Sequence, residues 1–253
     1  MPLDSSTYSL AGLRVDGRRW NELRRIHGEC STQSASDGSS YFELGNTKVI
    51  CTVNGPREGR RAGARDQSNA ANIECEINVA GFSGVDRKRR GRTDKRIQEM
   101  CHTISSAFTG TVFTHLFPHS TITIVLHVLS QDGSLLAACL NATTLAIIDA
   151  GIPMRDYVAA CTTGSTASYA ANDGEADPLL DLNGLEEQEL PFLTLGTSGG
   201  DDKVNVLIME TRVQMARLEA MISVGLDGCR QIRSILDGIV RAHGKKVLAS
   251  KVS

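Results

Sequence analysis

The segment 130–138 (SQDGSLLAA) joins an apolar run to a series of small residues, and its residue types can hold a phosphate. Asp132, Gly133 and Ser134 predict a tight turn that leaves backbone N–H groups free at the start of a helix. No Arg or Lys lies within the segment, and the next positions are Leu135 and Leu136. The turn therefore indicates either a phosphate site that lacks its cation or an ordinary strand-to-helix connection.

Two basic segments supply cations elsewhere in the chain. The first, 55–66, is rich in glycine, and the second, 86–96, holds seven Lys or Arg among eleven residues. Several cations that contact a polyanion release its counterions, which gives salt-sensitive binding through phosphates rather than bases. A solvated charged loop is the alternative. The candidate RNA-binding residues are Lys95, Arg96, Arg60, Arg61 and Arg92.

A third group of polar residues lies in the acidic segment 173–189. Asp181, Glu186 and Glu187 follow a short apolar run, and closely spaced carboxylates can act as acids, bases or metal ligands. A solvated acidic loop is the alternative interpretation. The histidines do not have the spacing of a helical metal pair, and no nucleotide-binding glycine motif or nucleophile elbow occurs. The sequence therefore predicts no metal and no cofactor.

Hydrophobic periodicity places these segments among alternating strands and helices. Strands are predicted at 40–44, 47–53, 71–80, 121–129, 157–163, 192–196 and 204–210. Helices are predicted from 97 to 108, from 136 to 150, and over 213–243 as either one long helix or two. Thr93 or Asp94 is the expected N-cap of the first helix. Strands followed by helices in two successive blocks predict an α+β fold without a linker.

Composition restricts the class of protein. The chain has 253 residues, of which 41% are hydrophobic and 22% charged, and its formal net charge is −2. These values are typical of a soluble globular protein and not of a uniformly basic nucleic-acid binder. Seven scattered cysteines without a C-x-x-C pair predict reduced thiols rather than disulfides or a zinc site. No signal peptide or membrane-spanning run is predicted, and residues 1–18 predict a flexible arm.

Several longer motifs carry a resemblance to a known family: GPRE at 55–58, QDGS at 131–134, NATTLAIIDAGIPMRDYVAAC at 141–161 and LLDLNGLEE at 179–187. With the basic loop that leads into a helix, they resemble the ribonuclease PH family, and within it the core subunits of the eukaryotic RNA exosome. The resemblance implies the α+β ribonuclease PH fold (ribosomal protein S5 domain 2-like). Two βα-type halves, 19–153 and 154–246, would pack as one unit within a domain that spans 19–253.

The resemblance also implies roles for single residues. Family enzymes shorten RNA from its 3′ end with inorganic phosphate as the nucleophile, which they hold in a D-G-G-T-R-type turn. Asp132, Gly133 and Ser134 keep this turn, whereas Leu135 stands for the threonine and Leu136 for the arginine. Losing a charge-assisted arginine contact to the phosphate costs orders of magnitude in rate.

A catalytic aspartate follows an E-D pair in the family. Glu186 and Glu187 match the pair, and an ungapped alignment places Leu193 at the aspartate. The basic pair that grips the RNA backbone matches Lys95 and Arg96. The resemblance therefore implies no catalytic residue, and the degenerate site consists of Asp132, Gly133, Ser134, Leu136, Glu187 and Leu193.

The implied function is that of a non-catalytic, RNA-binding subunit in a six-membered ring of ribonuclease PH-like chains. Such a ring carries S1/KH-type cap subunits and passes RNA to a hydrolytic exoribonuclease for 3′–5′ processing and decay of ribosomal and messenger RNA. The expected locations are nucleus, nucleolus and cytoplasm, without membrane association. The alternative is an active phosphate-dependent exoribonuclease that releases nucleoside diphosphates, with Arg57, Arg60 or Arg61 replacing the missing cation. A generic nucleic-acid-binding domain that is stable as a monomer is a third possibility.

Overall fold

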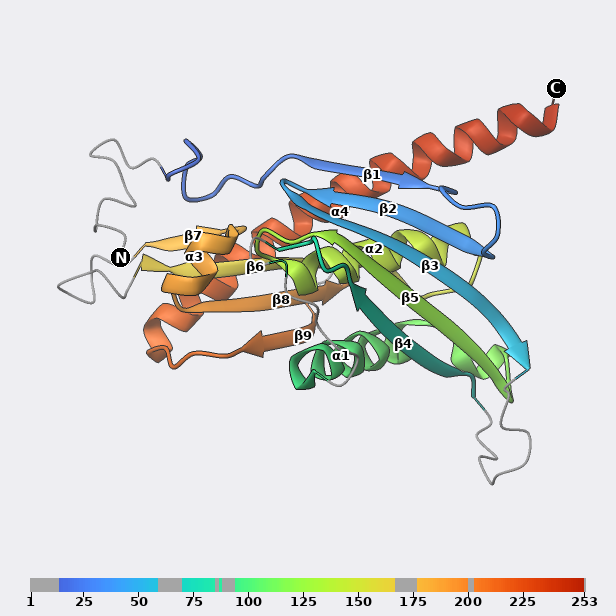
Figure 1. Ribbon diagram of the computed structural model, residues 1–253, viewed down its shortest axis with the longest axis horizontal. Helices are drawn as coiled ribbons and strands as arrows, with labels where there is room; N and C mark the ends of the chain where they lie inside the picture. The colour runs from blue at the N-terminus through green and yellow to red at the C-terminus, as the bar shows by residue number, and fades with distance from the viewer. Residues whose placement is uncertain are drawn as a thin grey trace.

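Two β-sheets enclose one central helix in the computed structural model, which describes residues 14–58, 70–84, 87, 94–166, 177–199 and 203–252 (Figure 1). The first sheet has the order β1-β2-β3-β5-β4, with β4 and β5 parallel and the other neighbours antiparallel. Its strands are β1 (Ile26–Cys30), β2 (Gly38–Leu44), β3 (Thr47–Glu58), β4 (Asn72–Val79) and β5 (Ser120–Ser130). The second sheet is antiparallel, in the order β7-β6-β8-β9. Its strands are β6 (Val158–Ser165), β7 (Pro178–Leu180), β8 (Phe192–Ser198) and β9 (Val204–Met209).

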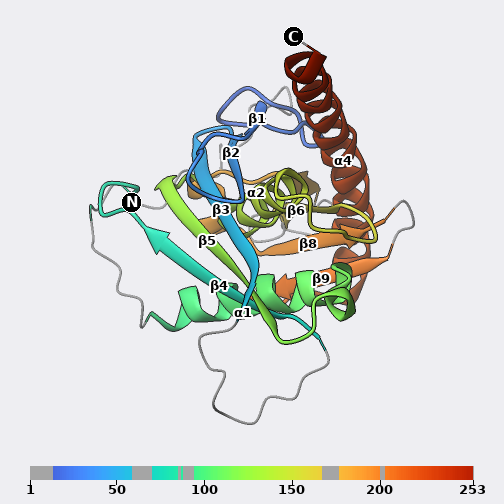
Figure 2. The ribbon, with the colours of Figure 1, turned by 90° about the vertical axis from the view of Figure 1, so that its right-hand side faces the viewer.

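The helices cover the faces of these sheets. α2 (Leu135–Asp149) lies between the two sheets, as the end-on view shows (Figure 2). α1 (Lys95–Thr111) packs against β4, and α4 (Met215–Val252) packs against β6 and continues past the body beside β1. The short elements are η1 (Thr114–Leu116) and α3 (Gly184–Glu189).

Small side chains allow α2 to be buried on all sides. Ala137, Ala138 and Ala142 are fully buried, so the backbones of both sheets approach the helix closely. Asn141 is also fully buried, and its side chain exchanges two hydrogen bonds of 2.9 Å with the backbone of Ala160 in β6. These bonds satisfy a polar group in the core and join the two halves of the chain. The halves therefore pack as one unit around α2.

Most elements expected from periodicity are present. The strands and the helices α1 and α2 lie where the pattern predicts them, except that β3 continues to Glu58, into the segment expected to be a basic loop. The 213–243 region forms the single helix α4, which continues to Val252. Asp94 is the N-cap of α1, and its side chain accepts a hydrogen bond from the backbone N–H of Arg96. The short elements β1, β7 and α3 are additions to the sequence-based assignment.

The end of the predicted arm contacts the body of the protein. Arg14 is buried and bonded to the second half of the chain, which corrects the assignment of residues 14–18 to an arm, and residues 1–13 lie outside the described part. Arg60, Arg61, Arg92 and most of the insertion expected at 167–177 also lie outside it. No helix in the described part of the chain is long and apolar enough to cross a membrane.

Candidate functional site: a turn filled by an internal carboxylate

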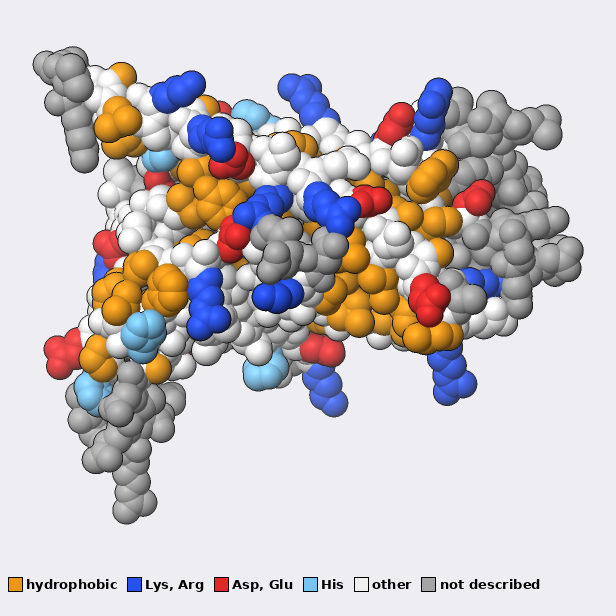
Figure 3. Space-filling view, turned by 180° about the vertical axis from the view of Figure 1, so that it is seen from behind, with side chains coloured by type: hydrophobic (Ala, Val, Ile, Leu, Met, Phe, Trp, Pro, Cys, Tyr) orange, Lys and Arg blue, Asp and Glu red, His pale blue; other side chains and the backbone are white. Residues whose placement is uncertain are grey.

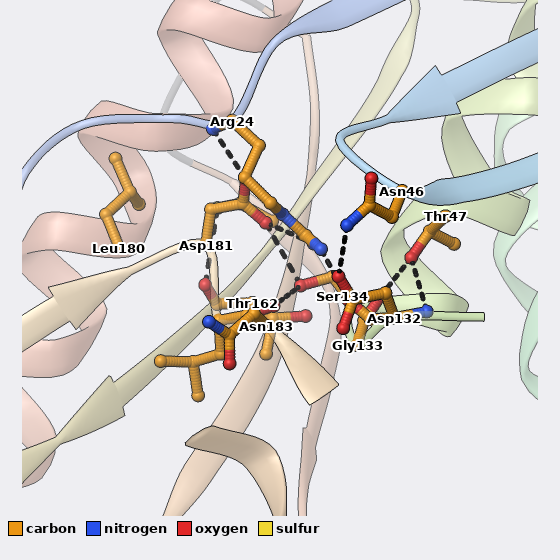
Figure 4. Close-up of polar contacts among 12 residues, drawn as sticks. Arg24, Asn46, Thr47, Asp132, Gly133, Ser134, Thr162, Leu180, Asp181 and Asn183 are labelled. Atoms are coloured by element: carbon orange, nitrogen blue, oxygen red, sulfur yellow. Dashed lines mark hydrogen bonds and ion pairs between the residues drawn. The ribbon is translucent and has the colours of Figure 1, made fainter. Parts of the chain in front are cut away.

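The 130–138 turn connects β5 to α2 and has an unusual backbone. Gly133 and Ser134 have positive φ angles of 75° and 54°, and two successive residues of this kind curl the chain tightly. Thr47 at the start of β3 fixes the curl from the neighbouring strand. Its hydroxyl accepts from the backbone N–H of Asp132 at 3.0 Å and donates to the carbonyl of Gly133 at 2.8 Å (Figure 4).

The side chain of Asp132 joins the turn to the second half of the chain. One carboxylate oxygen accepts from the side-chain amide of Asn46 at 2.9 Å, and the other accepts from the backbone N–H of Gly184 at 3.0 Å. Asp132 therefore holds the β2–β3 hairpin and the start of α3 against the same turn. Each oxygen of this carboxylate thus makes one structural contact.

Glu187 occupies the place where the turn would bind an anion. Its side chain accepts a hydrogen bond from the backbone N–H of Ser134, directly before the first residue of α2. Burial raises the pKa of Glu187, although the Ser134 N–H and the positive charges of Arg24 and Arg96 oppose this shift. An internal carboxylate thus takes the backbone donor that a phosphate oxygen would use at a helix start.

Asp181 is the centre of a buried ion pair behind the turn. Its two oxygens accept from Nε and Nη2 of Arg24 at 3.0 and 2.7 Å, and one of them also accepts from the Arg24 backbone N–H at 2.8 Å. The Ser134 hydroxyl lies 3.1 Å from the same carboxylate (Figure 4). Burial alone would lower the pKa of Arg24, and the neighbouring Asp181 charge reverses this and raises it. Arg24 therefore stays charged and ties the N-terminal segment to both halves.

Glu186 forms a second buried ion pair. Arg14 donates from Nε to its carboxylate at 2.8 Å and makes a further close Nη2 contact, while Nη1 donates to the Leu180 carbonyl at 2.6 Å. Asn183 and Glu186 also form a capping box at the start of α3. Asp181 is only 1% exposed and Glu186 only 3%. Asp181 and Glu186 therefore do not lie in a solvated acidic loop, and the two carboxylates hold the structure together.

A small pocket opens beside the turn between α1, α2 and the second sheet. Its volume is about 50 Å³, whereas small-molecule sites typically measure about 300–1,000 Å³. Its apolar lining includes Leu135, Leu136, Phe192 and Ile208. Leu136, which stands for the family's arginine, thus closes the space next to the turn with an aliphatic side chain.

The charges around this pocket are mostly negative. Among the described lining residues, Arg96 faces three carboxylates, those of Glu99, Glu187 and Glu210. Arg96 also lies 3.4 Å from the Glu210 carboxylate in an exposed ion pair. A phosphate dianion entering here would meet more negative than positive charge, and unpaired anions in a confined site are costly. The described lining therefore disfavours phosphate binding.

The structure brings together some of the sequence-derived site residues and separates others. Asp132, Gly133, Ser134 and Glu187 meet at the turn, and Leu136 lines the adjoining pocket. Leu193 is fully buried in β8 and does not line the pocket, although its neighbours Phe192 and Thr194 do. Alternation along the strand turns Leu193 to the opposite face.

Of the RNA-binding candidates, the structure describes Lys95 and Arg96. Lys95 is exposed in the first turn of α1, and Arg96 reaches from the same turn to the pocket. Sequence reasoning missed Arg14, Arg24 and Asn46, which hold the turn and α3 in place. Arg14 and Arg24 lie in segments without periodicity, and Asn46 lies in the turn between two predicted strands, where the sequence does not reveal its contact with Asp132. No group of three or more potential metal ligands occurs among the described residues.

Replacing Glu187 by Gln should make the protein more stable at neutral pH. Gln keeps an oxygen for the Ser134 N–H and removes the half-buried charge. The pKa of Glu187 is raised in the folded protein, so folding favours the protonated form of this side chain. As the pH rises through that pKa, the carboxylate becomes charged and the free energy of unfolding falls. The variant should therefore exceed the parent at pH 7, and the difference should vanish below the usual Glu pKa of about 4.3. Urea unfolding at both pH values measures this.

The exposed Glu219→Gln provides the matched control, with no expected difference at either pH. A Glu187→Gln variant that is less stable than the parent at pH 7 would show that the carboxylate is a net stabilising contact, contrary to this account.

Comparison with known proteins is consistent with this geometry. Models of the 3′ exoribonuclease family match residues 22–153 as its domain 1 and residues 156–228 as its domain 2. The chain is 42% identical to "Exosome complex component ski6" of Schizosaccharomyces pombe over 243 residues, covering 96% of each protein. It is 40% identical to "Exosome complex component RRP41" of Homo sapiens, covering 92% of each. The crystal structure of rice (Oryza sativa) Rrp46 superposes with a TM-score of 0.75 at 26% identity, covering 90% of this chain and 100% of that chain.

These matches extend over both sheets and the central helix, and they confirm the resemblance carried by the motifs. The two-sheet α+β architecture, the turn before α2 and the near full-length similarity lead to one assignment. The chain belongs to the ribonuclease PH family of 3′ exoribonucleases.

Proposed function

We propose that the chain is a non-catalytic, RNA-binding subunit of the exosome core ring. The observation that carries this proposal is the hydrogen bond from the Ser134 N–H to Glu187, which fills the anion position with part of the protein itself. The aliphatic Leu135 and Leu136 and the three carboxylates around the pocket support it. The similarity to proteins named as exosome components supplies the complex in which the subunit would act.

RNA contact is assigned to the start of α1. Lys95 and Arg96 are both exposed there, the first turn of the helix contains no acidic residue, and the ion pair of Arg96 with Glu210 is itself exposed. Cations at a helix N-terminus oppose the dipole, so their placement costs stability. Contact with RNA phosphates would offset this cost. The proposed basic surface also includes three residues that are assigned to it from the sequence alone: Arg60, Arg61 and Arg92.

Assembly with other chains is supported by exposed apolar side chains at a sheet edge. β9 is an edge strand of the second sheet, and Val204, Leu207 and Met209 are 44%, 50% and 40% exposed. An apolar edge strand is a risk for aggregation unless a partner covers it. Further hydrophobic patches lie between Lys and Arg side chains on the face seen from behind (Figure 3). The proposed partners are other ribonuclease PH-like subunits, S1/KH-type cap subunits and a hydrolytic exoribonuclease, in nucleus, nucleolus and cytoplasm.

Reversing the charge of the basic pair should weaken RNA binding by the reconstituted complex. Lys95→Glu combined with Arg96→Glu removes two phosphate contacts. Each contact contributes about −0.7 to the slope of log affinity against log salt on single-stranded RNA, so the slope should flatten by about 1.4. We expect affinity to fall about tenfold or more at low salt. Binding of a uridine oligonucleotide at several salt concentrations measures both values.

Lys245→Glu combined with Lys246→Glu reverses a matched exposed pair near the end of α4 and should leave the affinity unchanged. If the α1 pair can be reversed without any change in RNA affinity or salt slope, the assigned RNA contact is wrong.

The alternative function is phosphorolysis with another arginine in place of the missing one. Arg57, one candidate, is exposed at the end of β3 and forms an ion pair of 3.1 Å with Asp37, and it does not line the pocket. Purified complex should release no nucleoside diphosphate from RNA when inorganic phosphate is added. Phosphate-dependent release that is lost on replacing Arg57, Arg60 or Arg61 would establish the enzyme instead.

A further inference from the structure

A groove separates β1 from the distal half of α4. Its volume is about 680 Å³, within the range of known ligand sites. The helix continues past the body at this point, as both ribbon views show (Figure 1, Figure 2). The groove lies on the opposite edge of the first sheet from β4 and α1, and it shares no lining residue with the pocket beside the 130–138 turn.

One wall of the groove is the free edge of β1, which has no pairing strand on that side among the described residues. Ser31 donates its N–H to the Ser39 carbonyl of β2, and the Arg25 carbonyl accepts from Gly45. Hydrogen-bonded and non-hydrogen-bonded residue pairs alternate along an antiparallel pair of strands. The backbone N–H and C=O groups of the odd-numbered residues of β1 therefore point toward β2. The backbone N–H and C=O groups of Gly28 and Cys30 therefore point away from β2, and both residues line the groove.

The opposite wall comes from α4 and is mainly apolar. Ile235, Ile239 and Val247 line it, and Gly238 leaves a gap between them. A Cβ atom added at Gly238 would meet nothing within 4 Å. Glycine within a helix lowers its stability relative to alanine, and packing inside this chain does not require one here. The missing side chain at Gly238 widens the groove at this point.

Positive charge lies at the distal end of the groove, whereas nearer the body His243 pairs with Asp149 at 3.3 Å and Arg241 pairs with Asp237 at 2.8 Å. After Asp237 the chain contains Arg241, Lys245, Lys246 and Lys251 and no Asp or Glu. His243 and Lys246 belong to the lining itself, and Glu29 is the one acidic residue of that lining. An occupant that carries both carboxylates and apolar side chains would complement these walls.

We propose that an extended, acidic segment of a partner protein binds this groove by adding a strand to the free edge of β1. Its backbone pairs with Gly28 and Cys30, alternate apolar side chains contact Ile235, Ile239 and Val247, and its acidic residues face Lys246 at the distal end. Addition of a strand to a sheet edge beside a helix is an established mode of peptide recognition. The proposal does not depend on whether the subunit binds RNA through α1.

RNA fits this groove less well than a peptide. No Phe, Tyr or Trp is among its lining residues, whereas single-stranded RNA is held largely by stacking of its bases on aromatic side chains. The outward-pointing backbone N–H and C=O groups of β1 also have the spacing of the backbone groups in a peptide strand, and not the spacing of nucleotides in RNA.

The test uses the full-length chain and a fluorescein-labelled octapeptide of alternating valine and glutamate. Fluorescence anisotropy should show saturable binding, and hydrogen exchange should slow at the amides of Gly28 and Cys30. An octapeptide of alternating valine and lysine should not bind. Gly238→Leu, whose side chain enters the groove, should weaken binding about tenfold or more without lowering Tm, because leucine favours the helix.

Gly244→Leu is the matched control, since Gly244 is also a helix glycine with nothing within 4 Å of an added Cβ and does not line the groove. It should leave peptide affinity unchanged. The proposal fails if the acidic peptide does not bind, if it binds Gly238→Leu as tightly as the parent, or if a uridine octanucleotide displaces it from the groove.

Discussion

Replacing Asp181 by Ala should lower the free energy of unfolding by about 3–5 kcal/mol, the usual cost of removing one partner from a buried ion pair. Asp181 is 1% exposed and accepts three hydrogen bonds from Arg24, two of them from the guanidinium. Without the carboxylate, that guanidinium remains buried and keeps only the short contact to the Asp132 carbonyl. Urea unfolding followed by circular dichroism measures the loss.

Asp177→Ala, at an exposed position four residues earlier, is the matched control and should change stability by no more than about 0.5 kcal/mol. A double-mutant cycle of Asp181→Ala with Arg24→Ala should show strong coupling, because the second substitution removes the charge that the first leaves unpaired. If the two losses simply add, Arg24 and Asp181 do not form the interaction described.

The elements predicted correctly are those with long, regular patterns. α2 is recognisable because its run of small and apolar residues ends at Gly151 and Pro153, and α1 because apolar residues recur at helical spacing after Asp94. β1 has no such signal, because its residues IHGEC form a half-exposed edge strand with a glycine. β7 and α3 are too short for any period to appear.

The candidate site could be predicted only where the residues are adjacent in the sequence. The turn at Asp132 and Gly133 is one continuous motif, and its missing cation is visible at Leu136. The contacts that explain the site join residues far apart: Arg24 and Asp181 are 157 positions apart, and Ser134 and Glu187 are 53 apart. No local pattern encodes such pairs, because they result from packing of the two halves around α2.

The role of Glu187 illustrates this limit. The sequence places it in a family motif and leaves open whether it is catalytic, structural or solvated. The structure shows one of its oxygens bonded to the Ser134 N–H, in surroundings where burial raises its pKa. The contact with Ser134 thus gives Glu187 a structural role that its place in the motif alone does not reveal.

Replacing Gly133 by Ala should cost about 3 kcal/mol or more, because backbone strain and overpacking add at this position. Gly133 has a φ of 75°, a conformation that alanine adopts at a cost of roughly 1–2 kcal/mol. A Cβ atom would also lie 2.6 Å from the backbone carbon of Asn183 and 2.7 Å from the carbonyl oxygen of Leu182. Backbone atoms cannot rotate away, so the start of α3 must move.

Gly151→Ala separates these two contributions. Gly151 ends α2 with a φ of 69°, and an added Cβ would meet nothing within 4 Å. Its replacement should therefore cost only the strain of about 1–2 kcal/mol. The movement forced by Gly133→Ala should also break the bonds from Gly184 to Asp132 and from Ser134 to Glu187, which hydrogen exchange at the Gly184 and Ser134 amides can detect. Equal losses in the two variants, with both amides still protected, would mean that the turn and α3 are not held in the close contact on which the filled anion site depends.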